Sequence, residues 1–255
     1  MGAHLVKELL SMGHTVVALD DLSGGFRDQV DPRATFVQGS INDYALLDAL
    51  FEAHKFDNVY HLAAYAAEGL SHFIRGFNYQ NNLIGSINLI NASVRYKVKC
   101  FVFTSSIAVY GALHPPMRED MQPVPEDPYG VAKLAVELDL YAARHMFGLN
   151  YVVFRPHNVY GEYQNIGDRY RNVVGIFMNQ LMQGQSLSVF GDGLQQRAFS
   201  YVGDIAPVMA RCVDVPEAYG QVFNIGADTP YTVVELAGAV MEAMGVKGEL
   251  KHVEA

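Results

Sequence analysis

The residues of this chain best suited to chemistry are a serine hydroxyl, a phenol and an ammonium. Tyr129 and Lys133 open a helical pattern and stand four positions apart, so their side chains share one face of the helix. An ammonium beside a phenol lowers the pKa of the phenol toward neutrality, which predicts that Tyr129 gives and takes protons. Ser106 follows an apolar run that begins at Phe101 and is typical of a buried strand. Open α/β sheets bind ligands at the carboxyl ends of their strands, so we expect the three groups to meet over one substrate.

Strands and helices alternate from the N-terminus to Arg155. Short apolar runs predict strands over 15–20, 35–39, 58–63, 100–105 and 150–155. Apolar residues at helical spacing predict helices over 2–12, 43–53, 71–95 and 129–147, the third with a break near Gly76. This alternation favours right-handed crossovers and a doubly wound parallel sheet of the α/β class. Because the chain opens on a helix, we expect the first strand of such a fold to be missing and the centre of the sheet to be unfilled.

After Arg155 the chain becomes rich in Gly, Asn and Gln, and its predicted elements become shorter. We expect helices over 172–182, 204–213 and 232–244 and strands over 186–190 and 199–202. Asp204 is the predicted cap of the second helix, and Thr232 with Glu235 forms a capping box at the start of the third. These elements predict a smaller mixed α/β lobe for the substrate. The expected domains are 1–157 plus 198–226 and 158–197 plus 227–255.

Composition argues against several kinds of partner. Half of the 255 residues are apolar, enough for a sizeable core, and the formal net charge is −9. An acidic chain disfavours nucleic acid and anionic membrane surfaces, and no apolar run approaches the roughly 18 residues of a spanning helix. Cys100 and Cys212 stand in apolar surroundings and favour a reducing compartment, so the expected location is the cytoplasm. The histidines show no metal-ligand spacing, and we expect no metal.

Asp20 ends the predicted strand 15–20, the place where dinucleotide folds put a carboxylate against the adenosine ribose hydroxyls. A carboxylate there repels a 2′-phosphate, which favours NAD over NADP. The alternative is a turn-forming aspartate ahead of Ser23, Gly24 and Gly25. Of the glycine-rich motif that holds a pyrophosphate, Gly2 is the one member that this chain could carry.

Nine stretches follow one another along nearly the whole chain: Gly2-Ala-His-Leu-Val, Leu19-Asp-Asp-Leu-Ser, Gly39-Ser-Ile-Asn-Asp43, His61-Leu-Ala-Ala64, Asn82-Leu-Ile-Gly-Ser86, Ser105-Ser-Ile-Ala-Val-Tyr-Gly111, Tyr129-Gly-Val-Ala-Lys133, Arg155-Pro-His-Asn-Val-Tyr-Gly161 and Phe190-Gly-Asp-Gly-Leu-Gln-Gln-Arg197. In this order they resemble the extended short-chain dehydrogenase/reductase family, and within it the nucleotide-sugar epimerases. A Tyr-x-x-x-Lys pair alone occurs on many helices, whereas nine motifs in register are specific. The resemblance implies a Rossmann domain and NAD-dependent epimerisation of a nucleotide-diphosphate sugar, with 4-epimerisation of a UDP-hexose favoured.

The resemblance also implies roles for individual residues. Ser106 would hydrogen-bond the reacting sugar hydroxyl, Tyr129 would be the acid and base, and Lys133 would hold the ribose hydroxyls and lower the pKa of Tyr129. The implied NAD contacts are Gly2, Asp20, Asp21, Ser40, Ile41, Leu62, Ala63, Ala64, Asn82, Tyr129, Lys133, Pro156 and His157. The implied contacts with the nucleotide sugar are Ser106, Asn158, Asn172, Ser188, Phe190 and Arg197. An arginine fork suits a diphosphate because it offers charge and geometry together.

Ile107 and Ala108 indicate which reaction of the extended short-chain dehydrogenase/reductase family to expect. The nucleotide-sugar 4,6-dehydratases carry an Asp-Glu pair directly after the hydroxyl residue, and neither Ile107 nor Ala108 can transfer a proton. Hydride transfer, and with it epimerisation, is therefore favoured over dehydration.

Two alternatives stay open. One is a nucleotide-sugar reductase or synthase that consumes NAD(P)H. The other is a non-catalytic fragment that binds a nucleotide sugar, because the chain looks truncated at both ends when it is compared with the family.

The resemblance further implies a homodimer formed through helices near 71–95 and 129–147.

Overall fold

The computed structural model describes residues 1–168, 170 and 172–254. The chain divides into two compact units. The first consists of Met1–Pro156 and Ile205–Ile225, and the second of His157–Asp204 and Gly226–Ala255. The sequence predicted divisions after residues 157, 197 and 226.

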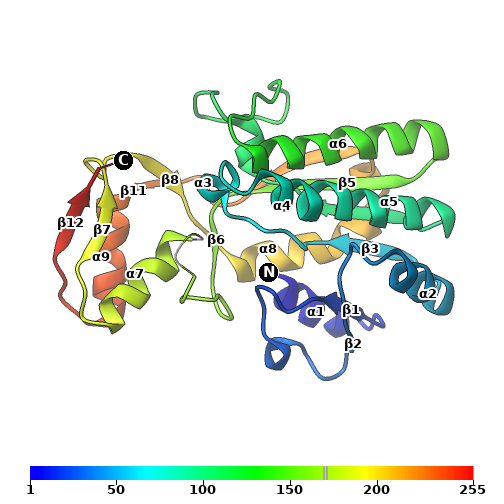
Figure 1. Cartoon of the computed structure of the whole chain (residues 1–255), viewed down its shortest axis with the longest axis horizontal. Helices are drawn as coiled ribbons and strands as arrows, with labels where there is room; N and C mark the ends of the chain where they lie inside the picture. Colours follow the sequence, from blue (N-terminus) through cyan, green and yellow to red (C-terminus); the bar gives the residue numbers. More distant parts are fainter. Residues whose placement is uncertain (169, 171, 255) are drawn as a thin grey trace. The chain divides into compact units, whose positions relative to one another are not determined.

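A parallel sheet forms the centre of the first unit (Figure 1). Its strands, in spatial order, are β10 (Gln221–Ile225), β5 (Asn150–Pro156), β4 (Cys100–Thr104) and β3 (Asn58–His61). In a separate two-stranded sheet, β1 (Val17–Asp20) pairs in parallel with β2 (Thr35–Gln38). The strand pairings described for this unit are all parallel, which confirms the predicted α/β fold. The centre of the sheet was expected to be unfilled. In the structure, β1 and β3 accordingly belong to two separate sheets.

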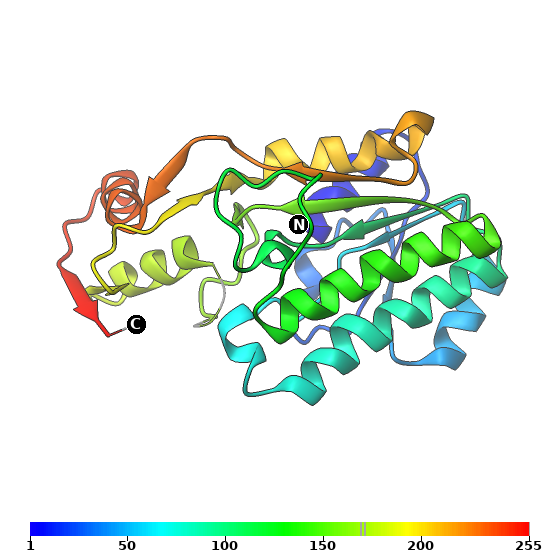
Figure 2. The ribbon, with the colours of Figure 1, turned by 90° about the horizontal axis from the view of Figure 1, so that it is seen from above.

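Three helices and the sheet share the main core of the first unit. They are α2 (Tyr44–His54), α5 (Gly85–Arg95) and α6 (Pro128–Phe147), and their apolar faces pack with Phe101, Phe103 and Val153 of the sheet. Figure 2 shows α5 and α6 side by side along the sheet. The N-terminal α1 (Gly2–Ser11) buries Leu5 and Leu9. None of the helices in the described part of the chain combines the length and the apolar character that crossing a membrane requires.

The second unit is built from short strands around two helices. Its helices α7 (Val173–Met182) and α9 (Val233–Met244) share a core with Leu187 and Val189. The strands β7 (Leu187–Phe190) and β12 (Leu250–Val253) pair in parallel, β8 (Gln196–Ala198) and β11 (Pro230–Thr232) pair antiparallel, and β6 (Val159–Tyr160) and β9 (Ser200–Tyr201) pair in parallel. The predicted capping box of Thr232 and Glu235 is confirmed at the start of α9.

Two predicted helices differ from the structure. The expected helix over 71–95 is divided into α3 (Glu68–Ser71), α4 (Arg75–Tyr79), the π-helical turn η2 (Gln80–Ile84) and α5, and the break that was predicted near Gly76 lies just before Arg75. Helical periodicity continues across such changes of hydrogen bonding, which is why the pattern did not reveal them. The expected cap Asp204 instead lies inside α8 (Val202–Arg211), because α8 follows β9 directly.

The start of α6 packs closely against the turn that follows β4. This turn is the 3-10 helix η3 (Ile107–Tyr110). At Gly130 an added Cβ would lie 2.6 Å from the carbonyl oxygen of Ala108 and 3.1 Å from Cβ of Pro125. A real Cβ does not approach a backbone oxygen so closely, so glycine at this position lets α6 contact η3.

We expect Gly130→Ala to destabilise the first unit by about 1–3 kcal/mol, the range for forcing extra atoms into a packed core. The clash is with backbone, which cannot rotate away as a side chain can. Thermal and urea unfolding of the full chain would measure the change.

A matched control is Gly76→Ala in α4 of the same unit, where an added Cβ would meet nothing within 4 Å. This variant should be as stable as wild type or more stable, because alanine favours helix over glycine. Equal effects of the two substitutions would contradict the packing argument.

Candidate active site

Ser106, Tyr129 and Lys133 come together at the carboxyl end of β4, as the sequence predicted they would. Ser106 follows this strand and caps η3, its Oγ accepting a hydrogen bond from the Ala108 amide at 3.1 Å. Tyr129 is the second residue of α6, and its side chain is in hydrogen-bonding contact with the Ser106 hydroxyl. The Nζ atom of Lys133 lies 5.7 Å from the centre of the Tyr129 ring. A hydroxyl, a phenol and an ammonium therefore form one cluster within the first unit.

The first turn of α6 is held by polar side chains from its own cap and from neighbouring helices. Asp127 caps the helix by accepting a hydrogen bond from the Gly130 amide at 2.9 Å. The Ser71 hydroxyl accepts from the Tyr129 amide at 3.3 Å, and the side-chain amide of Asn78 donates to the Pro128 carbonyl at 2.9 Å. Because all three bonds end on backbone next to or at Tyr129, they determine where its side chain begins.

Lys133 is buried, with only 2 % of its surface exposed. Its ammonium donates a 2.7 Å hydrogen bond to the Thr104 carbonyl and lies 4.7 Å from the centre of the Phe103 ring. Burial lowers the pKa of Lys133 to about 7, and the negative charge of Glu137 opposes this shift. Burial also lowers the pKa of His61 to about 3, with a smaller contribution from Lys133, so this histidine is neutral.

The expected lowering of the Tyr129 pKa is wrong for the chain by itself. Burial raises the pKa of this phenol, and the hydrogen bond from Ser106 only partly opposes the rise. The side chain is 7 % exposed, so a phenolate would lose most of its hydration. The spacing of Tyr129 and Lys133 indicated their shared face, but not how deeply the fold buries both.

A buried ion pair beside the cluster was not recognised in the sequence. Arg155 at the end of β5 donates to Glu137 of α6 through Nε at 3.1 Å and through a terminal nitrogen at 2.6 Å. The Ser105 hydroxyl donates to the same carboxylate. Two signals could have revealed the pair: Glu137 stands one helical turn beyond Lys133, and Arg155 is a charge within an apolar strand.

Groups at the carboxyl ends of the strands fit a dinucleotide such as NAD. Asp20 ends β1 with an exposed carboxylate whose Oδ1 accepts from the Leu22 amide at 2.7 Å, and Asp21 accepts from Ser23 at 2.9 Å. The sequence offered a turn at Asp20 as the alternative to a contact with the ribose. This turn forms in the structure, and it uses Oδ1 of the carboxylate. At the end of β4, the Thr104 hydroxyl is buried without a hydrogen-bond partner among the described residues. Together with the buried ammonium of Lys133, it offers polar groups that a bound ligand can satisfy.

Asn82, predicted to contact NAD, supports the loop that follows β3. Its side-chain oxygen accepts from the Tyr65 amide at 2.8 Å, and its nitrogen donates to the Tyr65 carbonyl at 3.0 Å and to Asn78 at 2.7 Å. Leu62, Ala63 and Ala64 lie in this loop, so Asn82 positions three other predicted contacts. Its own contact with NAD stays a prediction.

The remaining predicted NAD contacts of the first unit lie at the ends of elements. Gly2 is the first residue of α1, and Pro156 is the last of β5. Ser40 accepts a hydrogen bond from the Asn42 amide at 3.1 Å, and the Ile41 carbonyl accepts from Asn88 at 3.1 Å. These positions follow from the predicted strands and helices, and the contacts with NAD stay predictions.

Apart from Ser106, the residues predicted to hold the nucleotide sugar lie in the second unit, as does His157. Several of them make hydrogen bonds inside this unit: Asn158 to the Ala198 carbonyl at 2.8 Å, Asn172 to the Val159 carbonyl at 2.5 Å, Ser188 with Gln180 at 3.0 Å, and Arg197 to the Gln196 carbonyl at 2.8 Å. Phe190 is 59 % exposed, and Nδ1 of His157 is buried without a partner in the described chain. The substrate contacts of this group stay predictions.

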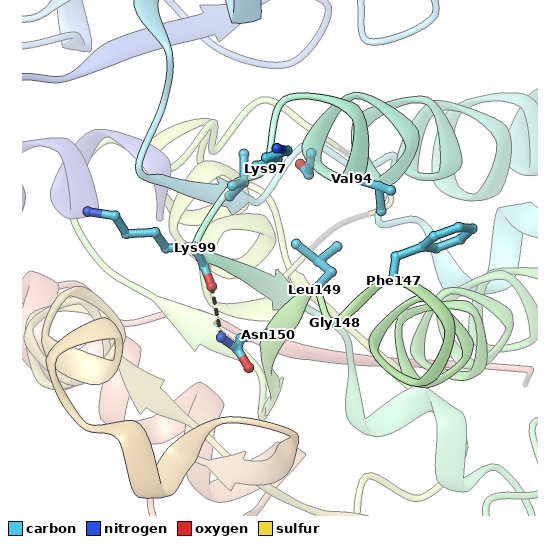
Figure 3. Close-up of a pocket in the computed structure, with 9 residues that line it drawn as sticks. Val94, Lys97, Lys99, Phe147, Gly148, Leu149 and Asn150 are labelled. Carbon is cyan, nitrogen blue, oxygen red and sulfur yellow. Dashed lines mark hydrogen bonds between the residues drawn. The ribbon is translucent and has the colours of Figure 1, made fainter.

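A pocket lies at the opposite edge of the sheet, where β4 and β5 begin (Figure 3). Lys97, Lys99, Phe147 and Asn150 are among its lining residues, and the Asn150 side chain donates to the Lys99 carbonyl at 3.2 Å. Parallel α/β sheets bind their ligands at the carboxyl ends of the strands. The pocket is therefore not the candidate active site.

No group of three or more His, Cys, Asp or Glu side chains suited to a metal ion occurs among the described residues. The polar groups near Tyr129 are a hydroxyl, an ammonium and an ion pair. This set can move a proton and hold an anionic oxygen.

Comparisons with known proteins identify the family of the chain. The model of the NAD dependent epimerase/dehydratase family matches residues 1–226. A UDP-glucose 4-epimerase of Lacticaseibacillus casei is 34% identical over 263 residues, covering 96% of this chain and 78% of that protein. The crystal structure of a Thermus thermophilus UDP-glucose 4-epimerase in complex with NAD has a TM-score of 0.93 and 31% identity, covering 99% of this chain and 83% of that one. A dTDP-glucose 4,6-dehydratase of Streptomyces antibioticus is 32% identical, covering 85% of this chain and 63% of that protein.

We expect the stability gained by Lys133→Met over wild type to depend on pH. Burial lowers the pKa of folded Lys133 to about 7, whereas an unfolded lysine titrates near 10.4. Between these values the unfolded chain binds a proton that the folded chain has lost, so wild-type stability rises with pH. Methionine removes this contribution. The gain should be on the order of a few kcal/mol at and below neutral pH and shrink toward about pH 10. Thermal unfolding across this range would measure it.

Lys99→Met is the matched control, because Lys99 is exposed and its ion pair with Asp57 raises its pKa. Its stability difference from wild type should stay constant over the same range. A constant difference for Lys133→Met as well would show that burial does not lower the pKa of Lys133.

Proposed function

This chain belongs to the NAD-dependent epimerase/dehydratase family, and we propose that it epimerises C4 of a nucleotide-diphosphate hexose, with a UDP-hexose as the favoured substrate. The observation that carries the proposal is the cluster of Ser106, Tyr129 and Lys133 at the carboxyl end of β4. A phenol in contact with a hydroxyl and above an ammonium can take the proton of a sugar hydroxyl and return it. The two UDP-glucose 4-epimerases named above support a UDP-sugar substrate.

The chain's own residues carry the proton in this reaction. Tyr129, as phenolate, removes the proton of the 4-hydroxyl while Ser106 hydrogen-bonds the same oxygen. NAD, when bound, would supply the acceptor for the C4 hydride and the donor that gives it back. After the 4-keto sugar has rotated about its diphosphate link, Tyr129 gives the proton back. Proton and hydride are both regained, so the cofactor is not consumed.

The phenolate of Tyr129 requires positive charge close to the phenol. Its pKa must fall by about 3 units from a normal value near 10, on the order of 4 kcal/mol, and burial acts in the opposite direction. The ammonium of Lys133, 5.7 Å from the ring centre, is the chain's own source of positive charge there. The oxidised nicotinamide ring carries a further positive charge.

We assign the binding of the rest of NAD to Asp20 and Asp21, at the adenosine ribose, and to the loop that Asn82 supports.

Ile107 and Ala108 favour epimerisation over dehydration. Both lie in η3 directly after Ser106, and Ala108 is buried against the start of α6. Neither can donate or accept the proton that elimination of water requires. A reductase or synthase would consume NAD(P)H in stoichiometric amounts, so sustained conversion of UDP-glucose without added NAD(P)H excludes it. A protein that only binds nucleotide sugar would show no conversion.

We propose that the second unit recognises the nucleotide diphosphate. Arg197 is exposed and can offer its fork to the diphosphate, and the exposed ring of Phe190 can stack on the base. Asn158, Asn172 and Ser188 are the other proposed contacts.

We place the protein in the cytoplasm, because both of its cysteines, Cys100 and Cys212, are buried free thiols.

We also propose a homodimer formed through the helices near 71–95 and 129–147. One face of α6 exposes Val131, Leu138 and Tyr141 at helical spacing, and Phe77 and Ile84 are exposed in the neighbouring helices. Exposed apolar side chains on neighbouring helices are typical of an interface. A second copy of the same face would bury it, as in other two-fold dimers.

Tyr129→Phe should reduce turnover of UDP-glucose by about 10²–10⁴-fold or more, because it removes the group that transfers the proton. Binding of NAD and of UDP-glucose, measured by titration calorimetry, should stay close to wild type. Tyr44→Phe is a control in which an exposed phenol of α2 loses the same oxygen, and its turnover should not change. Near-normal activity of Tyr129→Phe would refute the mechanism.

Leu138→Glu should convert the proposed dimer into a monomer, because it places a charge in the centre of the apolar face of α6. Sedimentation velocity at micromolar concentration would measure the mass. Val215→Glu changes an exposed apolar residue outside this face and should leave the dimer intact. A monomeric wild-type chain would overturn the proposed assembly.

A further inference from the structure

The ion pair of Glu137 and Arg155 lies in the core, with 7 % and 4 % of the two residues exposed. Two nitrogens of the guanidinium reach the two oxygens of the carboxylate, at 3.1 and 2.6 Å. Taking both charges out of water costs free energy that their attraction barely offsets, so a buried pair is weak evidence for a role in stability. The other contacts of the pair point to a different role.

These contacts lie on both sides of Ser106. The Ser105 hydroxyl donates to the Glu137 carboxylate, and the third nitrogen of Arg155 donates to the Tyr110 hydroxyl at 2.8 Å. Ser105 directly precedes Ser106, and Tyr110 is the last residue of η3, which Ser106 caps. The pair thus holds the backbone before Ser106 and the turn after it.

The network continues into the loop that joins Ser106 to Tyr129. The Tyr110 hydroxyl donates to the side-chain oxygen of Asn224 at 2.8 Å. Asn224 of β10 in turn donates from its side chain to the Met117 carbonyl at 3.1 Å and from its amide to Glu119 at 2.7 Å. Met117 and Glu119 both belong to the loop between η3 and α6, so one set of hydrogen bonds supports the start and the middle of this segment.

We propose that Glu137 and Arg155 are positioning residues for the proton transfer: they hold the Ser106 hydroxyl against the face of α6 that carries Tyr129 and Lys133. The proposal rests on the proposed function. Neither residue has to touch the substrate, because the pair acts through Ser105 and Tyr110.

Glu137 has a second effect, on the charge of Lys133. The groups that face this ammonium are Tyr129 and Glu137 from α6, the Thr104 carbonyl and the Phe103 ring from β4, and neutral His61 from β3. Glu137 supplies the negative charge among them. It therefore favours the protonated form of Lys133, which the phenolate of Tyr129 requires.

The decisive variant is the double substitution Glu137→Met with Arg155→Met. It removes both charges and keeps the volume of the core, so the thermal unfolding temperature should stay close to wild type or rise. With UDP-glucose as probe, kcat should fall by about 10²-fold, the loss that a 1 Å misplacement can produce, and KM should change much less. A double variant that is folded and has wild-type kcat would overturn the proposal.

Glu137→Gln tests the electrostatic effect without NAD or substrate. The Nζ signal of Lys133, followed by ¹⁵N nuclear magnetic resonance in lysine-labelled protein, should titrate at lower pH than in wild type. An unchanged titration would refute the electrostatic part of the proposal. Because this readout needs no turnover, it distinguishes a failure of the positioning proposal from a failure of the proposed epimerase activity, which would appear as an inactive wild-type chain.

The matched control removes an exposed ion pair of the same unit. Arg95 of α5 and Asp48 of α2 are joined at 2.6 Å, with half-exposed side chains. The double substitution Arg95→Met with Asp48→Met should change neither kcat nor the titration of Lys133. If it lowered kcat as much as the buried double variant, loss of any ion pair would explain the result and the positioning role would be rejected.

Discussion

The candidate active site depends on a single buried ammonium. Lys133 is placed in the core of the first unit, where water cannot solvate its charge, and burial lowers its pKa to about 7 although the charge of Glu137 opposes this shift. The groups that stabilise its protonated form are neighbours of the ammonium: the carbonyl of Thr104, the faces of two aromatic rings and the carboxylate of Glu137. Each of these groups lies on α6 or on β4. The position of α6 against the sheet therefore sets the electrostatics of the site as well as its shape.

This dependence explains why so many contacts converge on the first turns of α6. Asp127, Ser71 and Asn78 hold its first residues, and Gly130 lets the helix approach η3 to backbone contact distance. A small shift of α6 would separate Tyr129 from Ser106 and Lys133 from Thr104 together. The close packing that orients the phenol is the same packing that buries it and raises its pKa.

Periodicity and spacing were sufficient to predict the parallel α/β fold, the helix that begins near Tyr129 and the shared face of Tyr129 and Lys133. These features depend on neighbours close in sequence, which a pattern reports directly. The effects that escaped prediction arise from contacts between distant segments. The raised pKa of Tyr129 follows from burial by the whole unit, and the pairing of Glu137 with Arg155 joins residues 18 positions apart. The π-helical turn within the 71–95 segment was missed because such a turn keeps nearly the same apolar periodicity.

The two residues after Ser106 connect the electrostatics of the site to its chemistry. Ala108 is buried, and its carbonyl packs against Gly130 one residue from Tyr129. A carboxylate at this position would have to lose its hydration, and its negative charge would raise the pKa of the phenol further. Tyr129 already has to overcome burial in order to become a phenolate, and the groups beside it that can assist are the hydroxyl of Ser106 and the ammonium of Lys133. An apolar η3 therefore does more than omit the acid and base of a dehydratase: it keeps negative charge away from a tyrosine that must carry negative charge itself.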